Sequence, residues 1–410
     1  CSSLSLGRLS VNPQPFRLRP KARRGVVRAE GRDFIDDDGP FYPLGATLFW
    51  ALRGWKFDRT RLKENLLYLS KHKFDYVRIL GHVDWPDNNI DARWALTEDV
   101  LGEFLDYTYS IGLRTELTLL GNNVPNPLSI CRSVIPIIKS RPHMLLNIEM
   151  ANEAYDNGFS GDIPLLRRMT ALFVYAEVPN LLALTSGEGW PLDEVRNGLM
   201  IGGGATLQTI HMDREFGDEG WRTARQPWDW KGLPFPISHN EPIGPRSSVA
   251  EETSPIRLAM LRATGILCGV GAFVLHNAAG VAGQVDPAHD RPSNLWEVPG
   301  IDAIMEAVRN VDHFLPQRVS TGRYWNNQWT GNPCPADAIW PPSNHGVNRH
   351  YMVEHEKGFI STLNGIKQYV VLNPTRPTRL EVFSPTLEIV YGGDHIDAGD
   401  GGLIVKGTYL

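Results

Sequence analysis

Two carboxylic acids follow two strand-like segments of this 410-residue chain. Asn152–Glu153 comes at the end of the apolar run 144–151, and Glu241 comes at the end of the run 235–240. One carboxyl of such a pair can hold a proton for a leaving oxygen while the other attacks or activates water. Cleavage of a glycosidic bond requires these two functions, so the pair is a candidate for that chemistry.

The composition excludes several other classes of protein. Hydrophobic residues make up 42% of the chain, which is enough for a substantial core and argues against global disorder. The net charge of −5 gives no support for a nucleic-acid partner or an anionic membrane, although the first 32 residues carry eight Arg or Lys and one Glu. The longest apolar run, 263–275, is shorter than the roughly 20 residues of a membrane span. The four cysteines form no metal-binding pattern.

Apolar segments alternate with amphipathic, helix-like segments between about residues 41 and 280. The candidate strands are 42–49, 76–80, 114–120, 145–150, 181–185, 207–211, 236–239 and 271–276. The candidate helices are 58–72 (with Asp58 as its N-cap), 97–111, 134–140, 163–176 and 254–268. This alternation predicts a parallel sheet, and eight strands over roughly 250 residues favour a closed (β/α)8 TIM barrel. No glycine-rich phosphate loop follows a strand, which weakens a nucleotide-binding alternative.

The pattern changes after about residue 315, where turn signals separate short β-rich segments. We predict a basic N-terminal lead-in over 1–30, a catalytic barrel over 31–315, and a small antiparallel, sandwich-like β domain over 316–410. The segment Gly25–Ala29 is a candidate additional strand for the C-terminal domain. We expect that domain to pack against the barrel as a structural cap, with sugar binding as the alternative.

The order of several short motifs resembles the clan A glycoside hydrolases, of which the family 5 cellulases and mannanases are familiar members. The motifs are Phe34–Gly45, Val77-Arg78, Asn152-Glu153 and Glu241–Gly244, and the resemblance covers roughly residues 31–280. It implies a retaining (β/α)8 barrel with an Asn-Glu acid/base after strand 4 and a Glu nucleophile after strand 7. The expected partner is a polysaccharide or oligosaccharide with β-linkages, with no metal or organic cofactor. We expect a secreted or extracytoplasmic protein, although no signal peptide is visible.

The resemblance also implies roles for individual residues. Glu153 is the expected acid/base, with a pKa raised by burial and by its negative neighbour. Glu241 is the expected nucleophile, kept ionised by hydrogen bonds and by a cation such as Arg78. Asn152 is expected to bind the sugar 2-hydroxyl, and His211 is expected near the nucleophile.

Some of these candidates have structural alternatives. Arg78 can serve only to hold carboxylates together, and His211 can be a core histidine. His239 lies two residues before Glu241, so a regular strand points both to the same side; a site role and a packing role are both open.

Aromatic residues and departures from the family pattern bear on the substrate. Trp50 and Trp228 are our candidates for stacking on sugar rings, with loop packing as the alternative. Ala154 replaces the usual Pro after Asn-Glu, and His276 falls where a Trp commonly forms the floor of a subsite. These departures predict a substrate that differs from those of ordinary cellulases or mannanases.

Two other classes of function compete with a glycosidase. A catalytically inactive barrel that binds glycans or serves as a scaffold gains little from two apposed carboxyls. A metal-dependent hydrolase using His211, Asp213 and His239 lacks the His-x-His motif expected after an early strand.

Overall fold

A computed structural model provides the coordinates of the protein. It describes residues 22–30, 33–85, 88–154, 157–159, 162–183, 204–211, 236–242, 244–245, 252–253, 255, 258, 261–262, 270–283 and 293–314. In the C-terminal region it describes the strands 349–355, 358–364, 369–372, 378–383, 389–393 and 403–409.

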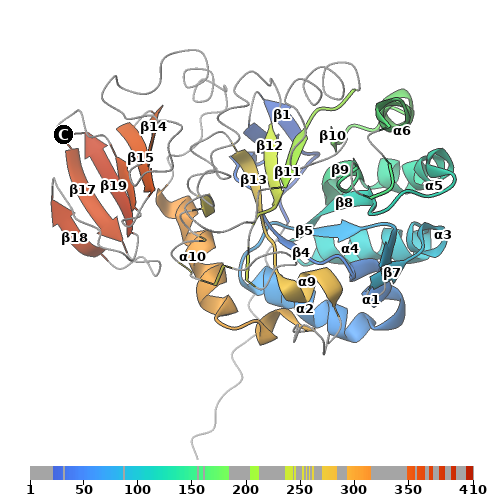
Figure 1. Cartoon of the computed structure of the whole chain (residues 1–410), viewed down its shortest axis with the longest axis horizontal. Helices are drawn as coiled ribbons and strands as arrows, with labels where there is room; N and C mark the ends of the chain where they lie inside the picture. Colours follow the sequence, from blue (N-terminus) through green and yellow to red (C-terminus); the bar gives the residue numbers. More distant parts are fainter. Residues whose placement is uncertain are drawn as a thin grey trace, which may run out of the picture.

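Eight parallel strands form the central sheet, as the sequence predicts (Figure 1). They are β4 (Leu44–Thr47), β5 (Tyr76–Leu80), β8 (Arg114–Leu120), β9 (Leu145–Ala151), β10 (Leu181–Ala183), β11 (Gln208–His211), β12 (Ile237–Glu241) and β13 (Val270–Leu275). The order is β10-β9-β8-β5-β4-β13-β12-β11, and a parallel bridge between Ala183 and Leu207 joins the two outermost strands. This bridge, made by the residue just before β11, nearly closes the sheet into a (β/α)8 barrel.

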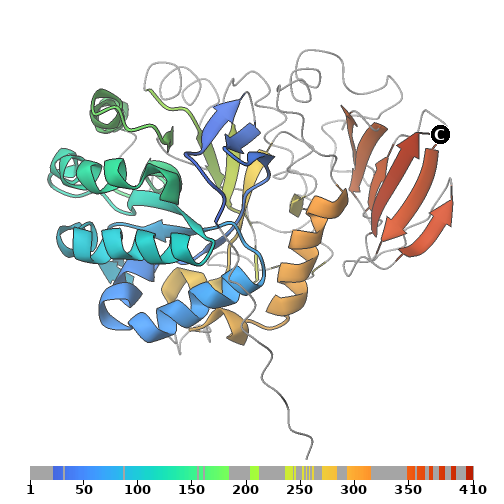
Figure 2. The ribbon, with the colours of Figure 1, turned by 180° about the vertical axis from the view of Figure 1, so that it is seen from behind.

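Helices cover the outside of this sheet. They are α1 (Ala51–Phe57), α2 (Arg59–Lys71), α3 (Ala92–Ala95), α4 (Glu103–Ser110), α5 (Pro127–Ser140), α6 (Ile163–Tyr175), α9 (Ala278–Ala282) and α10 (Ile301–Phe314). Seen from behind, the blue-to-green helices form one outer layer that continues to α10 in orange (Figure 2). The predicted helix over 254–268 lies mostly outside the described residues. Asp58 precedes α2 as predicted, but its side chain makes no capping bond and instead accepts a hydrogen bond from Arg61.

The middle strands of the barrel are buried on both faces yet carry polar residues. Every residue of β8 and β9 is buried. On β8 the apolar side chains Leu117 and Leu119 alternate with Glu116 and Thr118. Alternation places one set toward the helices and the other toward the barrel interior. The interior of this barrel is thus partly polar, which prepares the site described below.

An N-terminal three-stranded antiparallel sheet packs against the barrel. It contains β1 (Arg28–Glu30), β2 (Asp33–Asp36) and β3 (Gly39–Phe41). Val27, Phe34 and Phe41 form one apolar cluster with barrel residues that include Tyr76 and Leu146. The expectation that Gly25–Ala29 adds a strand to the C-terminal domain is therefore wrong in the described part of the chain, because β1 pairs with β2 instead.

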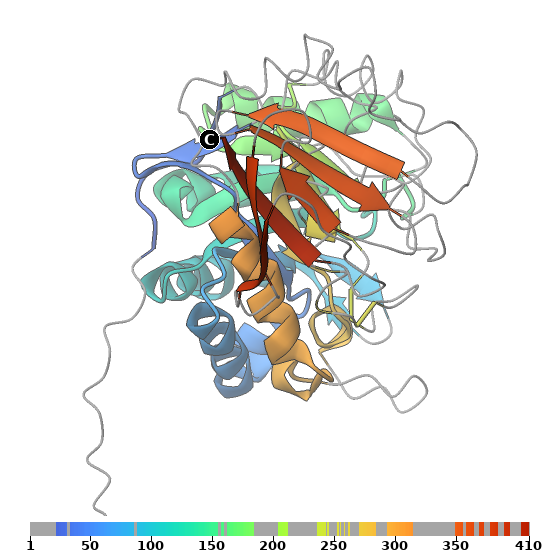
Figure 3. The same cartoon turned by 90° about the vertical axis from the view of Figure 1, so that its left-hand side faces the viewer.

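The C-terminal region contains a six-stranded sheet. Its strands are β14 (Arg349–His355), β15 (Gly358–Asn364), β16 (Tyr369–Leu372), β17 (Thr378–Phe383), β18 (Ile389–Gly393) and β19 (Leu403–Tyr409). The predicted antiparallel pairing is confirmed, except that β16 and β19 run parallel. The described strands form one sheet and not the two layers of a sandwich. Figure 3 shows this sheet on the side of the molecule that carries α10. Within the described ranges, no helix has the length and apolar character needed to cross a membrane.

The first residue of β8 joins the N-terminal sheet to the barrel. Arg114 donates to Asp36 at 2.7 Å, to Gly25 O at 2.8 Å and to His143 O at 3.1 Å, and its side chain is 3% exposed. One buried guanidinium therefore satisfies a buried carboxylate and several backbone carbonyls at once.

We expect Arg114→Ala to lower the free energy of unfolding by about 3–5 kcal/mol, because breaking a buried ion pair leaves buried acceptors unpaired. Arg24→Ala, which removes an exposed pairing with Asp38, should change it little. Urea unfolding of both variants measures the difference. Equal effects would show that Arg114 does not link the two sheets energetically.

Candidate active site

Glu153 leaves the end of β9 in an uncommon backbone conformation. Its φ is 40°, in the left-handed region that residues other than glycine seldom adopt. Asn157 holds this turn, since its backbone N–H donates to Glu153 O at 3.0 Å and its side chain donates to Asn152 O at 3.0 Å. The Glu153 side chain is 28% exposed. The acid is thus fixed at a strand end while it stays accessible.

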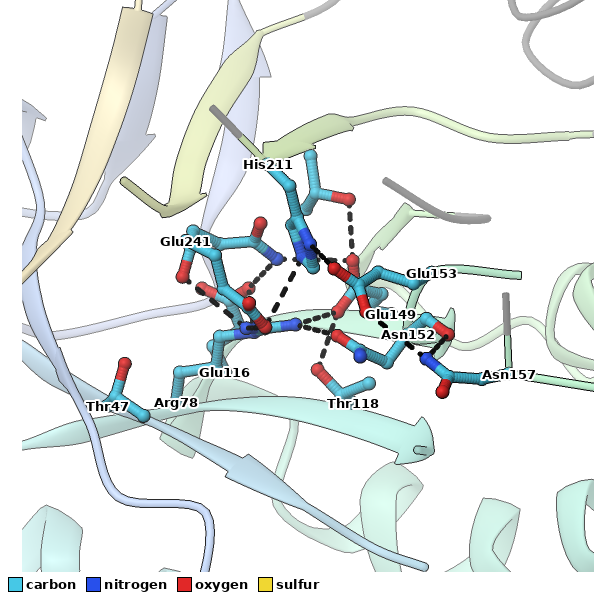
Figure 4. A network of polar contacts seen from close by, with 12 residues as sticks. Thr47, Arg78, Glu116, Thr118, Glu149, Asn152, Glu153, Asn157, His211 and Glu241 are labelled. Carbon is cyan, nitrogen blue, oxygen red and sulfur yellow. Dashed lines mark hydrogen bonds and ion pairs between the residues drawn. The ribbon is translucent and has the colours of Figure 1, made fainter. Parts of the chain in front are cut away.

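His211 lies between Glu153 and Glu241 (Figure 4). Its Nδ1 is 2.7 Å from Glu153 Oε1, and its Nε2 is 3.4 Å from Glu241 Oε1. One carboxylate oxygen of each acid and one ring nitrogen of His211 all lie within 4.8 Å of one another. The structure therefore brings together the two carboxyls that the sequence predicts from strands 4 and 7, with a histidine of strand 6 between them.

Arg78 of β5 lies below this trio with a fully buried side chain. Its Nη1 donates to Glu241 Oε1 at 2.5 Å, and its Nη2 donates to Asn152 Oδ1 at 2.8 Å. Burial alone would lower the pKa of Arg78, but the surrounding carboxylates outweigh burial and raise it. Arg78 thus has the contact with Glu241 that a role beside the nucleophile requires, and also the contacts with other carboxylates that the structural alternative requires.

Two further acids near Arg78 were missed by the sequence analysis. Glu149 lies 2.9 Å from Arg78 Nη2, and Glu116 lies 3.5 Å from Nε; both acids are fully buried. Asn240 donates to both of them at 3.1 Å. The available signal was a charged residue inside each of two strands that were predicted to be buried, because a buried charge requires a partner.

His276 directly follows β13 and is buried. Its Nδ1 is 2.8 Å from Thr47 Oγ1, and its ring is 5.9 Å from the ring of Phe49. The Arg78 guanidinium lies 5.0 Å from the same Phe49 ring. Phe49 and Thr47 were not predicted as site residues, and they connect His276 to Arg78 across the end of strand 1.

His239 is not brought to the carboxyl pair. It is fully buried, its ring packs 6.5 Å from Phe273, and neither ring nitrogen has a hydrogen-bond partner in the described part of the chain. Burial lowers the pKa of His239 to about 3, so the ring is neutral at ordinary pH. The expectation that His239 and Glu241 share a side fails where the pairing register of β11 and β12 shifts at the strand end, between Ile210 and His211.

The two tryptophan candidates differ in outcome. Trp50 is 2% exposed, its indole N–H donates to Ala279 O at 3.0 Å, and Arg61 lies over its ring. It lines a cavity of about 210 Å³ together with residues such as Phe57, but no residue of the carboxyl pair lines that cavity. This placement favours packing over sugar stacking. Trp228 lies outside the described residues.

Glu153, His211 and Glu241 also form the one donor set for a metal ion found among the described residues. His211 Nδ1 lies within hydrogen-bond distance of Glu153, whereas Nε2 lies 3.4 Å from Glu241 and has no hydrogen-bond partner in the described part of the chain. One ring nitrogen is enough to bind a metal ion, so the metal alternative stays a prediction to be tested. Asp213 of the metal alternative lies outside the described residues.

We expect His239→Leu to leave activity at pH 7 unchanged, because His239 contacts Phe273 and not the carboxyl pair. The unfolded His239 binds a proton below about pH 6.5, while the folded one does so only near pH 3, so wild-type stability falls as the pH drops through this window. The free energy of unfolding of the leucine variant should therefore rise relative to that of wild type by about 1.4 kcal/mol for each pH unit below 6.5. Urea unfolding at pH 7 and 5 measures the gain. Loss of activity in a folded variant would instead place His239 in the site.

Comparison with known proteins rests on structure alone, because no protein-family model and no curated protein matches the sequence. A glycoside hydrolase family 5 structure from Bacteroides vulgatus superposes with a TM-score of 0.66 at 11% identity, covering 94% of this chain and 92% of the other. A structure described as a glycoside hydrolase gives 0.59 at 12% identity, covering 94% and 93%. The exo-β-1,4-mannosidase Op5Man5 from Opitutaceae bacterium strain TAV5 gives 0.52 at 16% identity, covering 70% and 62%.

These identities are low, so the likeness establishes the fold and not the activity. The chain has the (β/α)8 fold of glycoside hydrolase family 5, and its structural neighbours are clan A glycoside hydrolases.

Proposed function

We propose that this protein is a retaining glycoside hydrolase that cleaves β-glycosidic bonds in a polysaccharide or oligosaccharide. The supporting observation is that an oxygen of one carboxyl lies within 4.8 Å of an oxygen of the other. Retaining enzymes place the carboxyls about 5–5.5 Å apart, whereas inverting enzymes need about 6.5–9.5 Å for the attacking water. The described geometry fits direct attack by one carboxylate.

The two carboxyls differ in the way the roles require. Glu241 is 5% exposed and paired with Arg78, which favours the ionised form that attacks the anomeric carbon. Glu153 is more exposed, where it can give a proton to the oxygen of the departing sugar. The resulting glycosyl–enzyme ester is then attacked by a water molecule, which gives its proton back to Glu153 and releases Glu241.

Three neighbours bear on this assignment. The side-chain oxygen of Asn152 accepts a hydrogen bond from Arg78. The amide N–H₂ group therefore remains to donate to the sugar 2-hydroxyl. His211 holds Glu153 at 2.7 Å and thereby fixes the orientation of the acid. His276 offers a polar group where an indole commonly lies, which favours contact with a sugar hydroxyl over stacking.

Glu153→Gln and Glu241→Gln should each lower kcat by at least about 100-fold, because each removes a group that acts on the reacting atoms. Azide should restore turnover of Glu241→Ala and give a product of opposite anomeric configuration. The assay is hydrolysis of aryl β-glycosides, β-glucans, xylans and β-mannans, with folding checked by circular dichroism. Glu64→Gln, an exposed acid on α2, is the matched control.

Full activity of either catalytic variant would contradict the assignment. A folded wild-type protein that binds glycans and hydrolyses none of these substrates would favour the catalytically inactive barrel.

EDTA should leave hydrolysis unchanged, because the proposed two-carboxyl mechanism uses no metal ion. Activity is measured before and after dialysis against EDTA. Loss of activity that returns with a divalent metal ion would favour the metal-dependent hydrolase.

A further inference from the structure

Three carboxylates surround one guanidinium in the interior of the barrel. Glu241 lies 2.5 Å from Arg78 Nη1, Glu149 lies 2.9 Å from Nη2, and Glu116 lies 3.5 Å from Nε. Arg78, Glu116 and Glu149 have no exposed side-chain surface. One buried cation cannot balance three buried anions, and a buried carboxyl without compensation takes up a proton.

Glu149 has the surroundings of an ionised carboxylate. Its Oε2 accepts from Arg78 at 2.9 Å and from the Thr118 hydroxyl at 2.6 Å. Its Oε1 accepts from the Thr209 hydroxyl at 2.6 Å and from Asn240 at 3.1 Å. Burial opposes its ionisation, but the guanidinium and these hydroxyl groups hold the pKa of Glu149 below its usual value. Four donors already face the two oxygens, and each of them favours the charged form.

Glu116 has different surroundings. Its Oε1 accepts from Asn240 at 3.1 Å, while its Oε2 has no hydrogen-bond partner in the part of the chain that the structure describes. The groups that titrate or carry charge around it are Arg78 and Tyr76 on β5, Glu149 on β9 and His211 on β11, with Glu241 on β12 beyond the guanidinium. Burial raises the pKa of Glu116 to about 7, even though Arg78 opposes this change. As the pH falls, Glu116 therefore takes up a proton before Glu149 does.

We propose that Glu149 and Glu116 have separate roles beneath the nucleophile. Glu149 is an ionised positioning residue that holds Arg78 toward Glu241, and Glu116 is a protonated acid that keeps another negative charge away from the same guanidinium. The proposal rests on the proposed function, because it takes Glu241 as the nucleophile. A negative charge on Glu116 would attract the Arg78 guanidinium through Nε. This attraction would weaken the contact between Arg78 Nη1 and Glu241.

The matched substitutions E149Q and E116Q test the two roles. Glutamine resembles a neutral carboxylic acid and not a carboxylate, so the same chemical change should matter more at position 149. We expect E149Q to lower kcat by about 100-fold with little change in KM, because it displaces a catalytic group. The loss of kcat in E116Q should be at least about tenfold smaller. Wild-type kcat should also fall as the pH rises through about 7, and the position of this fall should change in E116Q, where only Glu153 is left to lose a proton.

Two measurements read the proton directly, without glycosidase activity. In a Glu153→Gln background, where the proposed acid gives no carboxyl band, infrared difference spectra should show a protonated carboxyl band that titrates near pH 7, with or without E149Q, and adding E116Q should remove it. The folded Glu116 binds its proton more tightly than the unfolded one, so wild type should lose stability relative to E116Q as the pH rises from about 4.5 to about 7. If E116Q does not fold, Glu116→Asp keeps an acid and should shift the band instead of removing it.

The proposal is overturned if E116Q retains the band, or if E116Q lowers kcat as much as E149Q. Failure of the proposed function looks different. Full activity of Glu241→Gln would refute the nucleophile, while the infrared band and the pH dependence of unfolding would still report where the proton lies.

Discussion

The buried positive charge of Arg78 is the constraint on which the rest of the site depends. A guanidinium without exposed surface requires acceptors on several sides, and its planar fork fixes their directions. Nη1 contacts Glu241 of β12, while Nη2 contacts Asn152 after β9. Because one rigid group joins strands 4 and 7, the spacing of the carboxyl pair follows from the covalent geometry of an arginine on strand 2. Loop conformation then only has to place Glu153 above it.

His211 makes a second connection above the first, and the two connections differ in kind. Arg78 is permanently charged and buried, whereas His211 can give or accept a proton at each nitrogen. The ring lies 2.7 Å from Glu153 and 3.4 Å from Glu241, so the tighter contact is to the more exposed acid. Glu241 is thus held from below by a fixed charge, and Glu153 is held from the side by a hydrogen bond with an imidazole.

The fold followed from the sequence more fully than the site did. Eight apolar segments at regular spacing predict a barrel because each strand must bury both faces, and all eight are present. Residues at strand ends, such as Asn152 and Glu241, were predictable because parallel strands bring their carboxyl ends together. For Glu116 and Glu149 the strand pattern marks a buried charge that needs a partner, but it does not identify Arg78 as that partner, because the arginine comes from another strand. The prediction that His239 and Glu241 point to the same side was wrong, because a register shift beside the strand end breaks the simple alternation of side chains.

The polar interior also explains why the N-terminal sheet matters to Glu153 and Glu241, although it lies far from them. Barrel interiors are commonly filled by branched apolar side chains, whereas this one contains an arginine and two fully buried acids. Such charges interact strongly only where water is excluded. Val27, Phe34 and Phe41 pack with Tyr76, which lies two residues before Arg78 on the same strand. The N-terminal sheet, held by Arg114, thereby helps to keep water from the lower end of the barrel, where Arg78 and its buried acids interact.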